Sequence, residues 1–249
     1  MNAYELKDKL DKIAPFSISE KLKAIGYYDN SGVIFNGESD KVIATLDLTY
    51  GTIEYAKYSG CNLILTHHPV IFSPVTKIEG VLAECVKNSI GIVSAHLNAD
   101  FAQEGVDYHF AKLLGAVNET TLENYNFGTY GRFFRIKSQT LQEYSNFVSE
   151  KLNCKNVCVF GNKNGIVNSV ASFCGAGVDE KTIALAKNAD VIVSADIKHH
   201  LLLQLVEQGK SVIMPTHYAT ENYGFKQICV KLSKLIKEKV LYYEESTLL

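Results

Sequence analysis

The chain has 249 residues, enough to bury one large core or two smaller ones, and its 47% hydrophobic and 21% charged composition is that of a globular protein. Its formal net charge of -2 argues against nucleic acid as the main partner, because proteins that bind the phosphate backbone carry a basic excess. We see no signal peptide and no apolar stretch long enough to cross a bilayer. The six cysteines form no C-x-x-C pair and fit reduced, buried thiols. We therefore expect a cytoplasmic protein with no membrane partner.

The first half of the chain alternates between predicted helices and strands. Residues 2–14 carry Leu6, Leu10 and Ile13 at helical spacing, which predicts an amphipathic helix that begins near Asn2. The apolar runs 41–49 and 61–68 predict buried strands, and Pro69 prevents a helix after the second. The other predicted elements of this half are helices over 52–60 (closed by Gly60), 77–91 and 106–115, and a strand over 91–99.

The alternation continues after residue 126. Strands are predicted over 127–137, 156–161, 169–177, 190–196 and 211–217, and helices over 141–152, 179–188, 199–209 and 220–238. This order indicates an α/β fold with mainly parallel sheets flanked by helices. Since no proline- or glycine-rich linker separates the halves, we expect two closely packed α/β lobes. The first comprises residues 1–125, with 217–249 packing back on it, and the second comprises 126–216.

Three segments place metal-binding side chains after predicted strands, where open α/β sheets form ligand crevices. The first is LTHHPVIF, in which His67 and His68 end a strand just before a proline. Consecutive strand side chains point to opposite faces, so both serve one site only if the chain bends or if each reaches a different metal. A pair of surface histidines at a strand end is the alternative.

The second and third segments each pair a histidine with a carboxylate four residues later. In AHLNAD, a turn would bring His96 and Asp100 into one cleft, although Asp100 could equally cap the next helix. In THYATENYG, His217 and Glu221 lie one helical turn apart and face the same way. Imidazole beside carboxylate suits a divalent metal, and a cap with a helix-surface pair is the alternative.

Together the three segments offer more ligands than one closed structural zinc site needs. We predict two divalent ions about 3.5–4 Å apart, bridged by a carboxylate and a water. The predicted ligands are His67, His68, Asp100, His217 and Glu221. Glu221 is the candidate bridge and catalytic residue, and His96 is either a sixth ligand or an orienting neighbour. The ligand types suit zinc, manganese, iron, cobalt or nickel without choosing among them.

Several other features have weaker links to this site. His199 and His200 begin a predicted helix, where a structural position is favoured over a proton donor or phosphate contact. His109 lies inside a predicted helix and is expected to be structural. The segment GAGVDE (175–180) lacks a full phosphate-binding glycine pattern, which favours a tight strand-to-helix turn. Asp47 either faces the mouth of the cleft or caps a helix.

These motifs resemble the NIF-three-like family, also known as GTP cyclohydrolase I type 2 homologues. The similarity covers nearly the whole chain and includes YDNSG (28–32), DLT (47–49), LTHHPVIF (65–72), AHLNAD (95–100), GAG (175–177), ADIKHH (195–200) and HYATENYG (217–224). The resemblance implies a two-lobed α/β fold, a toroidal homohexamer and a dinuclear metal site in each subunit. The family's ligands match His67, His68, Asp100, His217 and Glu221, with His96 close by. Leu97 stands where the family often has threonine, and the inserted domain of longer members is absent.

The resulting hypothesis is a dinuclear-metal-dependent hydrolase that acts on a nucleotide or another small phosphorylated heterocycle. A ring-opening attack, as the cyclohydrolase name implies, and attack on a phosphoester both fit the predicted site. The alternative is a non-enzymatic protein that binds metal and a partner, since no residue clearly supplies an acid for the leaving group. A third idea is a structural metal that clamps the two lobes, which predicts that chelation unfolds the protein.

Overall fold

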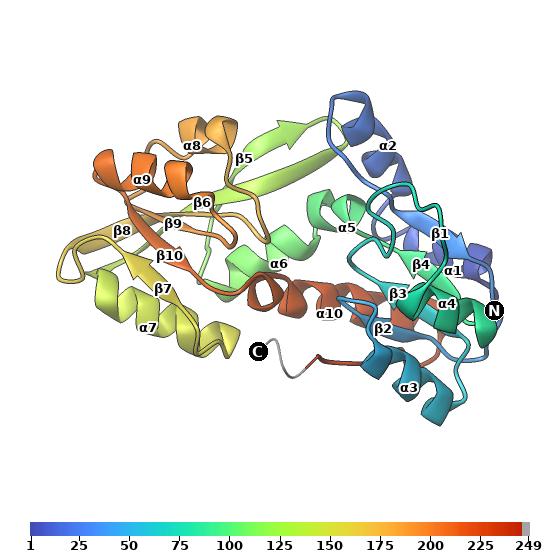
Figure 1. The fold of residues 1–249 in the computed structure, drawn as a ribbon. Helices are drawn as coiled ribbons and strands as arrows, with labels where there is room; N and C mark the ends of the chain where they lie inside the picture. The colour runs from blue at the N-terminus through green and yellow to red at the C-terminus, as the bar shows by residue number, and fades with distance from the viewer. Residues whose placement is uncertain (246–249) are drawn as a thin grey trace. The chain divides into compact units, whose positions relative to one another are not determined.

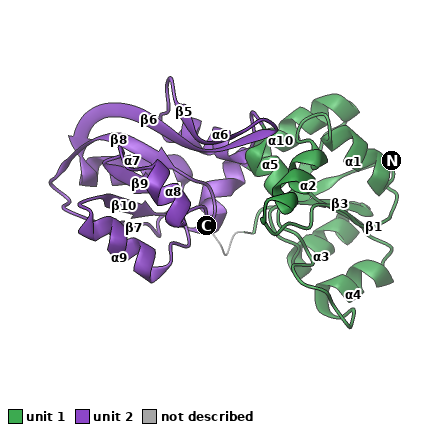
Figure 2. Ribbon diagram, turned by 90° about the horizontal axis from the view of Figure 1, so that it is seen from above, with its two compact units in different colours: residues 1–102, 225–246 green, residues 103–224, 247–249 purple. Residues whose placement is uncertain are grey.

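The computed structural model describes residues 1–245, which form two sheets flanked by helices (Figure 1). The predicted α/β class is confirmed. Contacts divide the chain into unit 1, Met1–Ala102 with the described residues from Phe225 onward, and unit 2, Gln103–Gly224 (Figure 2). The chain passes between them after Ala102 and again inside helix α10 (His217–Ile236). No helix among the described residues is both long and apolar enough to span a membrane.

The sheet of unit 1 has the strand order β1-β4-β3-β2-β11. Its strands are β1 (Gly32–Phe35), β2 (Ile43–Thr45), β3 (Leu63–Thr66), β4 (Gly91–Ser94) and β11 (Leu241–Tyr242). Only β1 is antiparallel to its neighbour, so the carboxyl ends of β2, β3 and β4 lie along one edge. The buried runs LILT and GIVS explain why β3 and β4 are central, since a strand covered on both faces has no polar face.

The helices of unit 1 are α1 (Ala3–Leu10), α2 (Phe16–Ala24), α3 (Tyr50–Ser59), α4 (Gly80–Lys87), α5 (Leu97–Phe101) and the later turns of α10. Asn2 caps α1 in a reciprocal bond with Glu5, and Gly60 ends α3 at φ +61°, as its left-handed cap requires. Ile53 of α3 and Cys85 of α4 share a buried cluster with residues of the sheet, which fixes these helices on it.

The sheet of unit 2 has the order β5-β6-β8-β9-β10-β7. Its strands are β5 (Thr120–Tyr125), β6 (Gly128–Thr140), β7 (Cys158–Phe160), β8 (Ile166–Ser172), β9 (Val191–Val193) and β10 (Ser211–Met214). Only β8, β9 and β10 run parallel to one another, so this sheet is mixed, whereas the sheet of unit 1 is mainly parallel. The carboxyl ends of these three strands again share an edge.

The helices of unit 2 are α6 (Val106–Leu113), α7 (Leu141–Leu152), α8 (Glu180–Leu185), α9 (His199–Glu207) and the first turns of α10. Helices α6 and α7 pack against β6 and β8, and α8 and α9 lie on the other face of the sheet (Figure 1). Because β5 is part of this sheet and α6 packs against it, the boundary between the two units lies at residues 102/103. The sequence suggested a boundary at 125/126. Residues 217–224, expected with the first lobe, belong to unit 2.

Candidate metal centre

His67 and His68 follow β3 directly, and the chain bends at this point. The Thr66 hydroxyl donates to the His68 carbonyl oxygen (2.9 Å), a local bond that a straight strand does not allow. The two ring centroids lie 5.0 Å apart, and one ring nitrogen of each histidine lies within 4.8 Å of the other. The side chains of His67 and His68 are 0% and 15% exposed. The bend that a shared site needs is therefore present, and the surface-pair alternative is wrong.

Asp100 lies beside His67 within unit 1. Its Oδ1 atom is 3.4 Å from Nε2 of His67, and the Asp100 side chain is only 6% exposed. Asp100 belongs to α5, and its backbone N–H donates to the His96 carbonyl oxygen (3.0 Å) in a helical pattern. The N-cap of α6 is Gly105, so the alternative in which Asp100 caps the next helix is wrong.

The three histidines of unit 1 use the same ring nitrogen for support. Their Nδ1 atoms lie against oxygens of the same unit: His67 against the Ala95 carbonyl (2.8 Å), His68 against Asp47 (2.7 Å) and His96 against Asp29 (2.9 Å). A carbonyl oxygen and an ionised carboxylate can only accept hydrogen bonds, so Nδ1 carries the proton in each ring. In the neutral form of each ring, Nε2 therefore carries the lone pair, and it is the atom that can bind a metal.

Asp29 is the most enclosed of these supporting carboxylates, at 2% exposure. It accepts hydrogen bonds from the His96 ring and from the Ser31 hydroxyl (2.8 Å), and Ser31 Oγ accepts the His96 backbone N–H (3.0 Å). Burial raises the pKa of Asp29, but neighbouring groups, with the hydrogen bond from His96 foremost and that from Ser31 among them, outweigh it and hold that pKa below its usual value. Asn30 donates to the Ile71 carbonyl oxygen (2.9 Å) and so ties down the loop after His68.

In unit 2, His217 and Glu221 form a pair on the first turns of α10. His217 Nε2 lies 3.0 Å from Glu221 Oε1, and the Glu221 side chain is 3% exposed. The opposite ring atom, Nδ1, lies 2.5 Å from Asp196 Oδ2, so His217 follows the same pattern as the histidines of unit 1. Because Glu221 is buried, the pair is not the helix-surface arrangement that the sequence left open.

Gly175 packs directly against this pair. It has a φ of +57°, and a Cβ there would lie 2.3 Å from Glu221 Oε1 and 3.1 Å from His217 Nε2. Its N–H donates to Thr220 Oγ1 (2.9 Å), and its carbonyl oxygen accepts from Ser194 Oγ (3.0 Å). The expected strand-to-helix turn is confirmed, with Asp179 as the N-cap of α8.

The charge state of His217 reflects its two carboxylate neighbours. Burial lowers its pKa, but the negative charge of Glu221 and the hydrogen bonds to Glu221 and Asp196 outweigh burial and raise that pKa to about 9. The metal-free ring is therefore protonated at neutral pH. A metal ion that binds Nε2 has to displace this proton.

The other residues singled out from the sequence lie elsewhere. His199 and His200 are exposed at the start of α9, and His200 Nε2 is 3.8 Å from Glu180 Oε1, which is also exposed. His109 lies in α6 against the rings of Tyr108 and Tyr223, in agreement with a structural position. Asp47 does not cap α3, whose N-cap is Thr49, because its carboxylate binds His68.

Sequence reasoning missed three residues of these clusters. Asp29 belongs to the segment YDNSG (28–32), but it was not singled out as a site residue, because it precedes an undetected short strand, β1. Asp196 follows β9 as the other candidates follow their strands, so the strand-end rule could have found it. Cys174 follows β8, and its Sγ lies within 4.8 Å of a Glu221 carboxylate oxygen.

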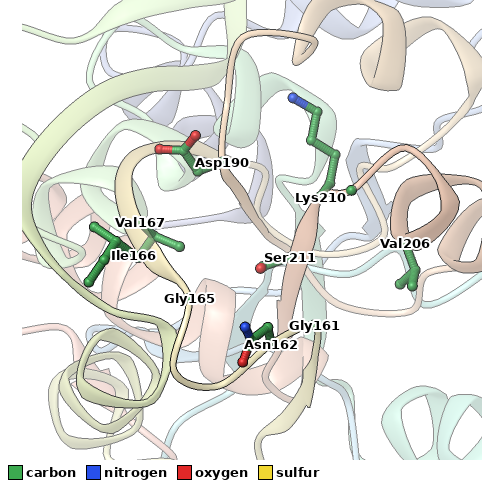
Figure 3. A pocket seen from close by; sticks show the side chains of 10 residues that line it. Gly161, Asn162, Gly165, Ile166, Val167, Asp190, Val206, Lys210 and Ser211 are labelled. Carbon is green, nitrogen blue, oxygen red and sulfur yellow. The ribbon is translucent and has the colours of Figure 1, made fainter.

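A cleft of about 420 Å³ opens at the opposite edge of the unit 2 sheet (Figure 3). Asp190, Lys210 and Ser211 line it near the amino ends of β8, β9 and β10. The Asp190 carboxylate already accepts the N–H groups of Asn168 (2.9 Å) and Ser169 (3.0 Å), and the Lys210 ammonium donates to two backbone carbonyls. Both charged groups bind backbone atoms and so stabilise the fold. The histidine clusters are therefore the better candidate site.

Comparisons with known proteins agree with the motifs. The profile of the Duf34/NIF3 (NGG1p interacting factor 3) family matches residues 1–247. A GTP cyclohydrolase 1 type 2 homolog of Clostridium perfringens is 25% identical over 96% of this chain and 93% of its own length. Another, from Methanocaldococcus jannaschii, is 28% identical over 97% and 98%. The crystal structure of a Bacillus cereus protein related to NIF3 superposes with a TM-score of 0.85 at 20% identity, covering 98% of this chain and 96% of that one, which shows a shared fold.

Proposed function

Because the chain belongs to the Duf34/NIF3 family, we propose that it binds two divalent metal ions and hydrolyses a nucleotide or another small phosphorylated heterocycle. The proposed ligands are His67, His68 and Asp100 of unit 1 and His217 and Glu221 of unit 2. Relatives at 25% and 28% identity carry the name GTP cyclohydrolase 1 type 2 homolog, which supports a nucleotide-like substrate.

The observation that carries the proposal is the shared orientation of the histidines. Each holds Nδ1 against an oxygen, and Nε2 of His67 and of His217 lies 3.4 Å and 3.0 Å from a buried carboxylate. Neutral imidazole together with carboxylate is a donor set that suits zinc, manganese, iron, cobalt and nickel. The residues present therefore fit a divalent metal. Gly175 adds to the fit, because any side chain there would occupy the space beside Glu221.

Two bound ions would lower the pKa of a shared water and neutralise negative charge that develops on the substrate. The chain's own residues supply the rest. Glu221 has two carboxylate oxygens and is the proposed bridge between the ions. His96 stands beside the ligands, with its ring centroid 5.5 Å from that of His67 and 5.9 Å from that of His68. Arg132 takes no part in substrate binding, because it is 2% exposed and paired with Asp107 (3.3 Å).

The test combines metal content with turnover. Protein purified without chelators and loaded with Mn²⁺ should hold two ions per chain by elemental analysis. It should also hydrolyse at least one compound in a screen of nucleotides and phosphoesters. Glu221→Ala should lose most of that rate, while Glu207→Ala, an exposed glutamate on α9, should keep it. If the fully loaded wild type is no faster than Glu221→Ala on every compound, the hydrolase proposal fails. A non-enzymatic protein that binds metal and a partner is then the better account.

We also propose that the chain assembles with itself into a homohexamer and resides in the cytoplasm. The hexamer rests on the family resemblance, and light scattering should give about six times the 27.6 kDa mass of one chain. The six cysteines form no disulfide, which supports a reducing compartment. Five of them are buried as expected, whereas Cys158 is exposed. Cell fractionation tests the location.

A further inference from the structure

We propose that Asp29, Asp47 and Asp196 are positioning residues that decide which ring nitrogen their histidines present to metal. The three pairs are His96 with Asp29 (2.9 Å), His68 with Asp47 (2.7 Å) and His217 with Asp196 (2.5 Å). The inference rests on the proposed metal centre, but it concerns the tautomer and orientation of the rings, which exist without metal.

The pairs are tertiary contacts in which each aspartate comes from a different element than its histidine. Asp29 lies before β1 and is 67 residues from His96, whereas Asp47 and Asp196 follow β2 and β9 and are each 21 residues from their partners. All three meet Nδ1, and none meets Nε2. A general need for charge pairing does not explain this choice of nitrogen in every case, whereas a need to direct Nε2 toward a metal ion does.

His67 also has Nδ1 against a hydrogen-bond acceptor, but this acceptor is a backbone carbonyl and not a carboxylate. Its Nδ1 lies 2.8 Å from the Ala95 carbonyl oxygen, a partner that can only accept a hydrogen bond. A backbone carbonyl therefore fixes the tautomer of His67, and carboxylates fix those of His68 and His96. At His217, the Asp196 carboxylate holds the proton on Nδ1. Since no side-chain substitution removes the Ala95 carbonyl, His67 serves as an internal reference.

For Asp196, a role in orienting His217 explains the structure better than a role in stabilising the fold. Its side chain is 58% exposed, and exposed ion pairs contribute little to the stability of a fold. Its φ is +49°, a left-handed conformation that residues with a Cβ atom adopt at a cost. An exposed ion pair therefore explains little of why this residue holds a costly conformation, and such conformations cluster at functional sites. Its carboxylate contacts Nδ1 of His217, and this contact accounts for the costly backbone conformation.

The test uses the Asp47–His68 pair, with Asp196 as a second case. In metal-free protein, ¹⁵N NMR of labelled histidine, assigned with His68→Gln, should show the Nδ1–H tautomer for His67 and His68. In Asp47→Ala, His68 should lose that tautomer while His67 keeps it. Calorimetry with Mn²⁺ at fixed pH should then give about 10–100-fold weaker binding. Asp47→Asn, which keeps an acceptor oxygen, should recover part of the affinity, and Asp8→Ala, an exposed site on α1, should change neither readout.

An unchanged His68 tautomer in Asp47→Ala, together with Mn²⁺ affinity within twofold of wild type, would overturn the inference. If wild type binds no Mn²⁺, the proposed function fails, and the NMR result still decides the positioning role. If circular dichroism shows that Asp47→Ala is unfolded, Asp196→Ala decides instead, because its exposed side chain can be removed without disturbing the core. A 10–100-fold loss of Mn²⁺ affinity in Asp196→Ala supports the inference, and an unchanged affinity refutes it.

Discussion

Replacing Gly175 by alanine should remove metal binding while leaving the fold intact. The new Cβ would lie 2.3 Å from Glu221 Oε1, so this oxygen has to move by about 1 Å to reach an ordinary contact distance of 3.4 Å. The turn itself is held by the Thr220 and Ser194 hydroxyls, which leaves the carboxylate as the group that gives way. Ligand distances in metal sites are met to within about 0.2 Å, so after this displacement Glu221 can no longer act as the proposed ligand.

The energy of this change has two separable parts. A non-glycine residue at a φ of +57° costs about 1–2 kcal/mol of folding free energy, which urea denaturation measures. The loss of a ligand is larger than the 10–100-fold effect of losing a ligand's support, so Mn²⁺ affinity should fall by about 100-fold or more in calorimetry.

Gly209 provides a matched control. Its φ is +73°, and a Cβ there would meet nothing within 4 Å. Gly209→Ala therefore carries the same backbone strain without a clash, and should lose about 1–2 kcal/mol of stability while keeping Mn²⁺ affinity. If Gly175→Ala binds Mn²⁺ as tightly as Gly209→Ala does, the argument from the position of Glu221 is refuted.

Three further outcomes are expected. Arg132→Met should destabilise unit 2 by about 3–5 kcal/mol in chemical denaturation, because it leaves Asp107 as a buried charge without its cation; Arg135→Met, at an exposed arginine, is the control, and equal effects would contradict the pairing. Burial raises the pKa of Asp190, but the N–H of Asn168 and the N–H and hydroxyl of Ser169 outweigh it and lower that pKa below 3.8. Its contribution is therefore complete above about pH 4 and disappears as the pH falls through the lowered value, so Asp190→Ala should cost about 1–3 kcal/mol at pH 7 and less at pH 3. A deficit that does not shrink in acid would count against this account. Finally, EDTA should remove metal without changing the circular dichroism spectrum, because the proposed open site does not hold the fold together, whereas unfolding would favour a structural metal.

Local signals in the sequence were sufficient to predict most of the helices and strands. Asn2, Gly60, the apolar run 61–68 and the amphipathic pattern of 141–152 act through caps, turns and periodicity, which depend on neighbouring residues alone. The missed elements were short or polar, such as β1 and β5, whose stability comes from the strands they pair with. The rule that ligands follow strand ends also needed only local information, and it gave the proposed ligands His67, His68, Asp100, His217 and Glu221.

The support of those side chains depends on the tertiary structure. Asp100 could have capped a helix or faced His67, and the structure excludes the cap because Gly105 occupies the N-cap position of α6. Asp47 could have faced the cleft or capped a helix, and the pairing of β2 with β3 decides for its contact with His68. Asp29 lies in the segment YDNSG (28–32), but its pairing with His96 could not be found, because no local pattern links residues 67 positions apart. Residue types and spacing determine which side chains can bind a metal. The packing of distant strands decides which nitrogen each of them presents.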